Sequence, residues 1–296
     1  SKTIRNCDGS HEGWHKMYKA VMMVTPSHFN VEYIINPYMK DTAGRPNKVN
    51  RTAAQKQWEG VKAKFESLGV KVHVIEGQPG LPDMVFSANH GFPFINSKTG
   101  KPSILMSQMK NPERRGEIPF VEKWFAQNGY VVEHLSNPKW FFEGNGDAIM
   151  HPNQKIVFAG HGHRTDVAVY DDFKTRFGFE VLPVKMLTDN FYHLDTSFSI
   201  LNNETVVIQP AAFTEKDYKT LTQGFRNVIN VDMQESLKQL AANCFCPNDK
   251  DVVVHQGTEK FKSAVARAGF NVHEVDTSEF LKSGGSVFCM KLALPK

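Results

Sequence analysis

The sequence predicts an α/β fold in which five similar units close into one rounded domain. Each unit has an amphipathic helix, then a glycine at a position typical of a left-handed helix end, then a short apolar strand. The five glycines follow one another at separations of 60, 49, 46 and 45 residues, a period typical of repeated supersecondary units. These glycines are Gly69, Gly129, Gly178, Gly224 and Gly269. Because the five units nearly exhaust the 296 residues, one closed domain is favoured over two unrelated domains.

Local apolar patterning predicts the elements of these units. The first long helix is predicted for residues 55–68, where Trp58, Val61 and Phe65 recur on one face. Short apolar runs predict the strands, and further periodic segments predict two more helices. The predicted strands are 20–24, 103–106, 155–159, 205–208 and 252–254, and the further helices are 122–128 and about 232–240.

Composition favours an ordinary globular protein, with 41% hydrophobic and 22% charged residues. The net charge of +4 is small and dispersed, so nucleic-acid binding is not expected. No apolar run reaches the ~20 residues of a membrane helix. Four cysteines in so long a chain do not predict a disulfide framework, which favours the cytoplasm. We expect a polar lead-in at 1–18 and a single catalytic domain at 19–296, and a homo-oligomer stays an open possibility.

The segment 283–290 contains a Gly-Gly turn followed by a short apolar strand that carries Cys289. Two glycines before a thiol allow backbone groups and a substrate to approach closely. A thiol attacks as a thiolate, and free cysteine titrates near ~8.5, so a base or a cation is needed nearby. The alternative is that Cys289 is a buried strand residue without a chemical role.

Polar side chains recur at similar distances after the repeated glycines. They are Asp83 and Glu143, each fourteen residues after its glycine, His193, fifteen residues after, and Cys289, twenty residues after. If a pseudo-rotation relates the units, these four side chains converge on its axis. A thiol, an imidazole and two carboxylates suit nucleophilic catalysis on a cationic substrate. The fourth unit offers only Lys238 and Gln239, which we interpret as a solvated helix face.

Two other kinds of site are not favoured. His151, His161 and His163, with Cys244 and Cys246, lack the ligand spacing of a zinc site, so no metal is expected. The short run at 144–146, Gly-Asn-Gly, lacks the third glycine of a dinucleotide fingerprint, so no cofactor is expected.

Four motifs together resemble the guanidine-modifying enzymes of the pentein superfamily. This group includes dimethylarginine dimethylaminohydrolase, arginine deiminase, arginine dihydrolase and the amidinotransferases. The motifs are Pro-Asp-Met-Val-Phe at 82–86, Glu-Gly-Asn-Gly-Asp at 143–147, His-Leu-Asp at 193–195 and Gly-Gly-Ser-Val-Phe-Cys at 284–289. The resemblance covers residues 20–294 and implies a five-bladed α/β propeller with its active site at the centre.

The resemblance also implies the role of each candidate residue. Cys289 attacks the guanidinium carbon, His193 moves protons between the leaving amine and water, and Glu143 orients His193. Asp83 and Asp195 hold guanidinium nitrogens of a small-molecule substrate. Two arginines resemble the clamp on the substrate α-carboxylate: Arg164, and either Arg114 or Arg115, of which Arg114 is favoured.

One difference within the superfamily favours the dihydrolases. Deiminases and dimethylaminohydrolases usually carry a carboxylate where this chain has Asn89, and Asn89 together with Asn36 is most similar to arginine dihydrolases. A neutral amide suits an uncharged citrulline-like intermediate, whereas a carboxylate prefers the cation. We therefore expect conversion of arginine to ornithine, carbon dioxide and ammonia. The alternatives are a dimethylarginine dimethylaminohydrolase or arginine deiminase, then an amidinotransferase, and outside enzymes a catalytically silent binding scaffold.

Overall fold

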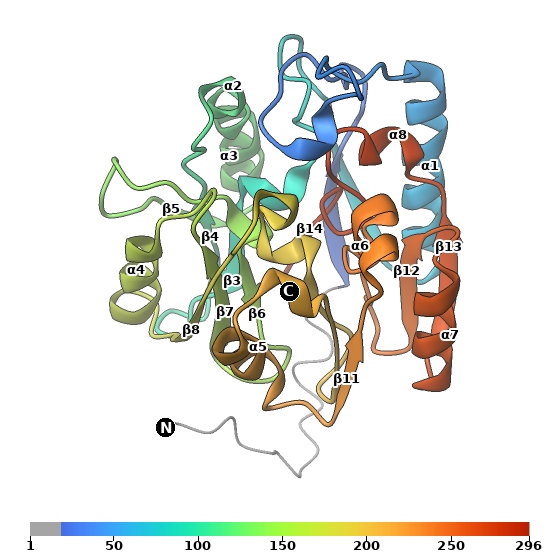
Figure 1. The fold of residues 1–296 in the computed structure, drawn as a ribbon. Helices are drawn as coiled ribbons and strands as arrows, with labels where there is room; N and C mark the ends of the chain where they lie inside the picture. The colour runs from blue at the N-terminus through green and yellow to red at the C-terminus, as the bar shows by residue number, and fades with distance from the viewer. Residues whose placement is uncertain (1–18, 296) are drawn as a thin grey trace.

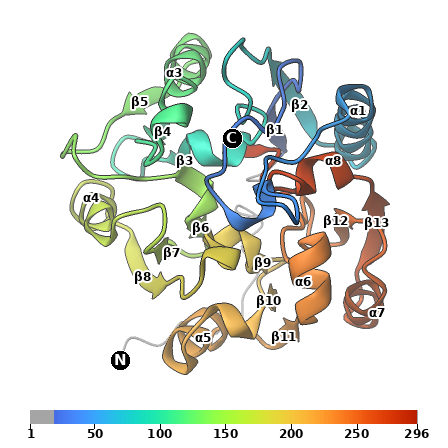
Figure 2. The same ribbon diagram turned by 45° about the horizontal axis from the view of Figure 1, so that its top comes forward.

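The computed structural model describes residues 19–295 of the chain, so the predicted lead-in at 1–18 lies outside the described residues. Five small sheets surround a common centre, and the long helices lie on the outside of the ring (Figures 1 and 2). This arrangement confirms the predicted five-bladed α/β propeller.

The first sheet joins the two ends of the described chain. Strand β1 (Ala20–Val24) lies between β14 (Leu292–Leu294) and β2 (Lys71–Ile75). The β1–β14 pairing is antiparallel, and the β1–β2 pairing is parallel with helix α1 (Arg51–Ser67) between the two strands in the chain. The ring is thus closed by hydrogen bonds between the first and last strands, and this closure fixes the segment that carries Cys289.

Three further sheets share one connection pattern. An inner strand pairs antiparallel with a middle strand, and an outer helix leads to a third strand that is parallel to the middle one. The strands are β3 (Gly91–Ile95), β4 (Pro102–Met106), β5 (Val131–Glu133), β6 (Ala148–Met150), β7 (Ile156–His161), β8 (Glu180–Lys185), β9 (Phe198–Ile200), β10 (Thr205–Ile208) and β11 (Asn227–Asn230). The outer helices are α3 (Ile118–Gln127), α4 (Tyr170–Thr175) and α5 (Glu215–Thr222).

The fifth sheet follows the same order with a shortened inner strand. Strands β12 (Asp251–His255) and β13 (Asn271–Val275) are parallel and joined through helix α7 (Glu259–Arg267). The inner strand is reduced to one antiparallel bridge between Phe245 and Val253. Two short helices, α6 (Met233–Gln239) and α8 (Ser278–Leu281), lie between units, and the short helix α2 (Pro112–Arg115) lies between β4 and α3.

The expected elements form close to their predicted bounds, with three corrections. Helix α3 begins at Ile118, four residues before its predicted start at 122. Helix α1 begins at Arg51, four residues before the predicted start, because the Asn50 side chain accepts from Ala53 N and caps the helix. The expectation of a left-handed glycine fails for Gly224. The other four repeat glycines have positive φ, but after α5 the C-cap Gln223 stays right-handed and Phe225 N donates to Thr222 O.

Five apolar clusters fill the spaces between the sheets and helices. The largest of them joins α1, β1 and the C-terminal segment, and in it Phe65 meets Phe245 edge to face at 5.6 Å. Within residues 19–295, no helix is long and apolar enough to cross a membrane.

Candidate active site

Short 3-10 turns bring polar side chains to the centre of the ring. One such turn precedes each of three inner strands: η2 (Ser87–His90), η3 (Gly144–Gly146) and η6 (Leu194–Thr196). Turn η3 contacts both η2 and η6. Glu143 lies five residues before strand β6, and His193 lies five residues before strand β9. The same position before strand β3 is held by Phe86, and Asp83 lies three residues earlier. The equal offset of Asp83 in the sequence therefore did not mark an equivalent position.

The Gly-Gly turn before Cys289 needs both of its glycines. Gly284 has φ +85°, and a Cβ there would come within 2.9 Å of Asn36 Oδ1 and of the Tyr192 hydroxyl. At Gly285 a Cβ would lie only 2.3 Å from the Phe86 ring. Two glycines therefore let the C-terminal segment pass through the centre of the ring.

Cys289 is buried and contacts two other buried polar side chains. Its Sγ donates to Asp195 Oδ2 at 3.3 Å, and Asn243 Nδ2 donates to Sγ at 3.2 Å. Burial raises the pKa of Asp195 to about 7. Burial and the neighbouring Asp195 carboxyl raise the pKa of the Cys289 thiol well above its ordinary range. In the unliganded centre the thiol is therefore protonated at neutral pH.

His193 and Glu143 form a second buried cluster. Its carboxyl group has a lowered pKa, whereas the pKa values of Asp195 and Cys289 are raised. His193 Nε2 lies 2.9 Å from Glu143 Oε1, and Arg164 NH1 donates to the same oxygen at 2.8 Å. Burial alone would raise the pKa of Glu143, but Arg164 and His193 outweigh it and hold that pKa well below its usual range. Because an ionised Glu143 only accepts hydrogen bonds, His193 Nε2 carries a hydrogen and donates it, which leaves Nδ1 as the ring nitrogen without a partner.

Asp147 fixes the turns that carry this second cluster. Its Oδ2 accepts from the Thr165 hydroxyl at 2.6 Å, and its Oδ1 accepts from Leu194 N at 3.1 Å, next to His193. Thr165 Oγ1 in turn accepts from Glu143 N at 3.1 Å. Burial raises the pKa of Asp147 to about 6. This carboxyl group thus links the backbone positions of Glu143 and His193.

Asp83 and Asn36 both bind the segment before the Gly-Gly turn. Asp83 accepts from the Ser283 hydroxyl at 3.0 Å and from the Tyr33 hydroxyl at 2.7 Å. Asn36 Nδ2 donates to Ser283 O at 3.0 Å. Burial raises the pKa of Asp83. Both candidate residues therefore lie against the turn that leads to Cys289.

Arg114 has internal partners in place of the expected substrate carboxylate. Its side chain is 3% exposed and donates to Glu117, to Asn89 Oδ1 at 2.8 Å and to Asp83 O at 3.2 Å. Its alternative, Arg115, donates to the backbone carbonyls of Met109 and Lys110. The pocket that opens beside Asn36 and Arg164 is lined by neither arginine. Arg114 is thus occupied by internal partners, whereas Arg115 is exposed, and a clamp on the substrate carboxylate by either arginine stays a prediction.

Three buried polar atoms at the centre have no hydrogen-bond partner among residues 19–295. They are Asn89 Nδ2, His193 Nδ1 and Asp195 Oδ1. Two of them face Gly146, where a Cβ would lie 2.5 Å from Asn89 Nδ2 and 3.2 Å from His193 Nδ1. Unpaired buried polar atoms are costly, so a ligand that pairs with them would bind favourably.

Asn243 was missed by the analysis of the sequence. It is fully buried, and besides contacting Sγ it accepts from Ser286 N and Cys289 N and donates to Asp195 O. Helix α6 lengthens the fourth unit, so a count of fourteen residues from Gly224 ended inside that helix. Asn243 lies nineteen residues after Gly224, close to the twenty that separate Gly269 from Cys289. A count of about twenty residues from Gly224 would therefore have identified Asn243 as a candidate.

The histidines considered for a metal do not gather with other ligands. Among residues 19–295 no group of three or more His, Cys, Asp or Glu side chains is placed to hold an ion. His151 stacks on Phe225 at 5.5 Å between ring centroids.

Comparison with known proteins gives one family and several relatives. Residues 25–294 match the family described as "N,N dimethylarginine dimethylhydrolase, eukaryotic". An uncharacterised protein of Caenorhabditis elegans is 35% identical over 93% of this chain and 94% of its own length. The N(G),N(G)-dimethylarginine dimethylaminohydrolase of Mycobacterium tuberculosis is 32% identical, with 92% of this chain and 84% of the relative covered.

Arginine dihydrolases are also among the similar proteins. The bifunctional arginine dihydrolase/ornithine cyclodeaminase of Nostoc sp. is 30% identical over 92% of this chain, which spans only 37% of that relative's length. The product-bound N-terminal domain of ArgZ, an arginine dihydrolase from cyanobacteria, has a TM-score of 0.86 at 28% identity. That match covers 93% of this chain and 97% of that domain.

The raised pKa of Cys289 predicts slow alkylation of the unliganded protein. Iodoacetamide reacts with the thiolate, so the rate at Cys289 should rise with pH and show no plateau up to pH 9. The rate is measured by mass spectrometry of the Cys289 peptide, with Cys289→Ser as the blank. A plateau reached below pH 8 would show that the resting thiol is already ionised and would contradict the raised pKa of Cys289.

Proposed function

The chain belongs to the eukaryotic N,N-dimethylarginine dimethylhydrolase family, and from this premise we propose that it is an arginine dihydrolase. In this proposal it is a C–N hydrolase that converts L-arginine to ornithine, carbon dioxide and ammonia through covalent adducts of Cys289. The observation that carries the proposal is the orientation of the Asn89 amide.

Asn89 presents a hydrogen-bond donor to the centre of the ring. Arg114 NH1 donates to Asn89 Oδ1, so the free atom of this amide is Nδ2. A guanidinium group has only donors and cannot pair with Nδ2, whereas the carbonyl oxygen of a ureido group can accept from it. We infer that Asn89 holds the citrulline-like intermediate for a second hydrolysis, and that Arg114 positions Asn89 for this task.

Substrate binding supplies the charge that Cys289 lacks. The Asp195 and Asp83 carboxyl groups hold the guanidinium nitrogens, and Asp195 has a free Oδ1 for this purpose. A cation beside the thiol lowers its pKa, so the substrate helps to form its own nucleophile. The thiol proton passes to His193, whose Nδ1 is without a partner.

The first hydrolysis then uses the same groups in two steps. The Cys289 thiolate adds to the guanidinium carbon, and His193 returns its proton to the departing nitrogen, which leaves as ammonia. Water activated by His193 adds to the thiouronium carbon, the C–S bond breaks, and a ureido group forms. Glu143 keeps the imidazole of His193 oriented throughout.

The second hydrolysis repeats this sequence on the ureido carbon. The thiolate displaces the second ammonia, and water releases a carbamate that loses carbon dioxide to give ornithine. Arg164, which lines the pocket beside Asn36 and Tyr192, binds the substrate α-carboxylate while its NH1 stays paired with Glu143. Asn36 lies at the entrance and holds Ser283 of the Gly-Gly turn.

Dimethylarginine hydrolysis is the second candidate. It is favoured by the family description and by the 32% identity to the mycobacterial dimethylaminohydrolase. In that reaction the leaving group is dimethylamine and the product is citrulline, so Asn89 Nδ2 would meet a ureido oxygen only in the product. In an amidinotransferase or a silent scaffold, His193 Nδ1 would not activate water for hydrolysis. In a silent scaffold, Asp195 Oδ1 would also bind no reacting guanidinium.

The test is the product and the ammonia count after incubation with L-arginine. We expect ornithine and two molecules of ammonia per arginine, and no turnover by Cys289→Ser. Citrulline with one ammonia would overturn the dihydrolase assignment while retaining the hydrolase. No turnover of arginine but release of dimethylamine from asymmetric dimethylarginine would support the second candidate. No turnover of either compound would contradict both.

Asn89→Asp should separate the two hydrolyses. The carboxylate replaces the donor with an acceptor, and loss of a buried hydrogen bond of about 1.5–3 kcal/mol corresponds to a roughly tenfold or larger loss in the second step. We expect citrulline to accumulate and the ammonia count to fall toward one. The matched control is Asn96→Asp, in a surface turn where only the oxygen accepts, from Lys98 N. Two ammonias from Asn89→Asp would contradict the role of the amide.

A further inference from the structure

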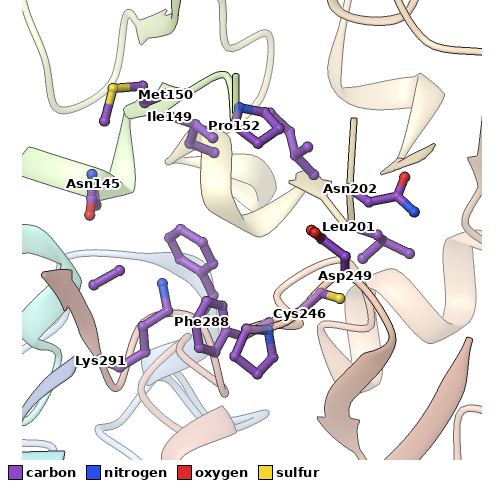
Figure 3. Close-up of a pocket in the computed structure, with 14 residues that line it drawn as sticks. Asn145, Ile149, Met150, Pro152, Leu201, Asn202, Cys246, Asp249, Phe288 and Lys291 are labelled. Carbon is purple, nitrogen blue, oxygen red and sulfur yellow. The ribbon is translucent and has the colours of Figure 1, made fainter. Parts of the chain in front are cut away.

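A second cavity lies among the inner strands, apart from the pocket beside Arg164. It is lined from strand β6, the end of β9, the 245–249 loop and the C-terminal segment (Figure 3). It shares no lining residue with the pocket beside Arg164. None of the residues assigned above to catalysis or substrate binding lines it. The cavity is therefore not explained by the proposed reaction.

Lys291 is the one basic residue among those that line this cavity. Its side chain is 1% exposed, and its Nζ lies 3.3 Å from the centroid of the Phe288 ring and 4.4 Å from that of the Phe245 ring. Within residues 19–295, no hydrogen bond or ion pair involves its amino group, whereas buried lysines are normally paired with an anion. The amino group is directed into the cavity in Figure 3. A buried amine thus faces this cavity with two aromatic rings beside it and no hydrogen-bond partner among the described residues.

The remaining walls define the ligand that would suit this amine. They include the aliphatic side chains of Ile149, Ile200 and Leu201 and the two phenylalanine rings. Lys291 supplies the one positive charge among the lining residues, which suits a ligand with a single negative charge. We propose that this cavity binds a small monocarboxylate with an aliphatic or aromatic body, whose carboxylate pairs with Lys291.

Binding of a carboxylate should be coupled to protonation of Lys291. Burial lowers the pKa of Lys291 to about 7, while Asp195, Cys289 and Cys244 act in the opposite direction. A carboxylate favours the charged amine, so binding raises the pKa of Lys291 in the complex. The affinity should be highest below pH 7 and fall as the pH rises through and above that value, with uptake of a proton on binding.

The test uses hexanoate and its neutral analogue hexanamide in isothermal titration calorimetry. We expect the wild-type protein to bind hexanoate and not hexanamide, and Lys291→Met to lose tenfold or more of the affinity. Met keeps the length of the side chain and its contact with the rings. Arg164→Met and Lys123→Met, which change the arginine of the other pocket and an exposed lysine, should bind hexanoate as the wild type does.

Other outcomes would overturn the inference. They are no binding of hexanoate by the wild type, equal binding of hexanamide, unchanged affinity in Lys291→Met, or loss of binding in Arg164→Met, which would place the ligand beside Arg164. If Lys291→Met does not fold, the wild type decides alone. Hexanoate binding with proton uptake near pH 7 supports the site, and binding without proton uptake contradicts it. The inference does not depend on the proposed reaction, because its readout is binding at a different cavity.

Discussion

The centre of this protein depends on a thiol and a carboxyl group that are buried together without a cation in contact. Cys289 and Asp195 meet at 3.3 Å, and Asn243 joins them through an uncharged amide. No Lys, Arg or His side chain of the described residues forms an ion pair with Asp195. Two negative charges in such surroundings would be costly, so burial raises the pKa of both groups, and a positive charge that enters beside them favours their ionised forms. The lack of a positive charge beside Cys289 and Asp195 suits the binding of a guanidinium, which remains cationic at every physiological pH.

Glu143 shows the opposite arrangement a short distance away. It is as deeply buried as Asp195, but Arg164 and His193 donate to it, so it stays ionised and fixes the hydrogen of His193 on Nε2. The pKa values of two buried carboxyl groups are thus shifted in opposite directions, which is typical of a site that separates proton transfer from substrate binding. Arg114 acts in a third way, because it sets the direction of the Asn89 amide without needing to touch the substrate.

The sequence was sufficient for the fold because its signals are local. A helix that ends at a glycine and continues into an apolar strand leaves a pattern within a few residues, and the family motifs lie in short continuous segments. The contacts of Asn243 and Arg114 could not be predicted in this way. Asn243 meets Cys289 across 46 residues and Arg114 meets Asn89 across 25, and no periodic pattern records such pairings. The internal partners of Arg114 could not be predicted because a motif fixes a residue's position but not the partners of its side chain.

The most direct measurement is the pKa of Cys289 in the presence of guanidinium and of urea, its neutral isostere. The ultraviolet absorbance of the thiolate is followed against pH, with Cys289→Ser subtracted, at concentrations far below those that unfold the protein. If a missing positive charge holds the thiol protonated, guanidinium should lower the pKa of Cys289 and urea should leave it unchanged. Equal pKa values with both ligands, or a thiol already ionised at neutral pH without either, would contradict substrate-assisted formation of the nucleophile.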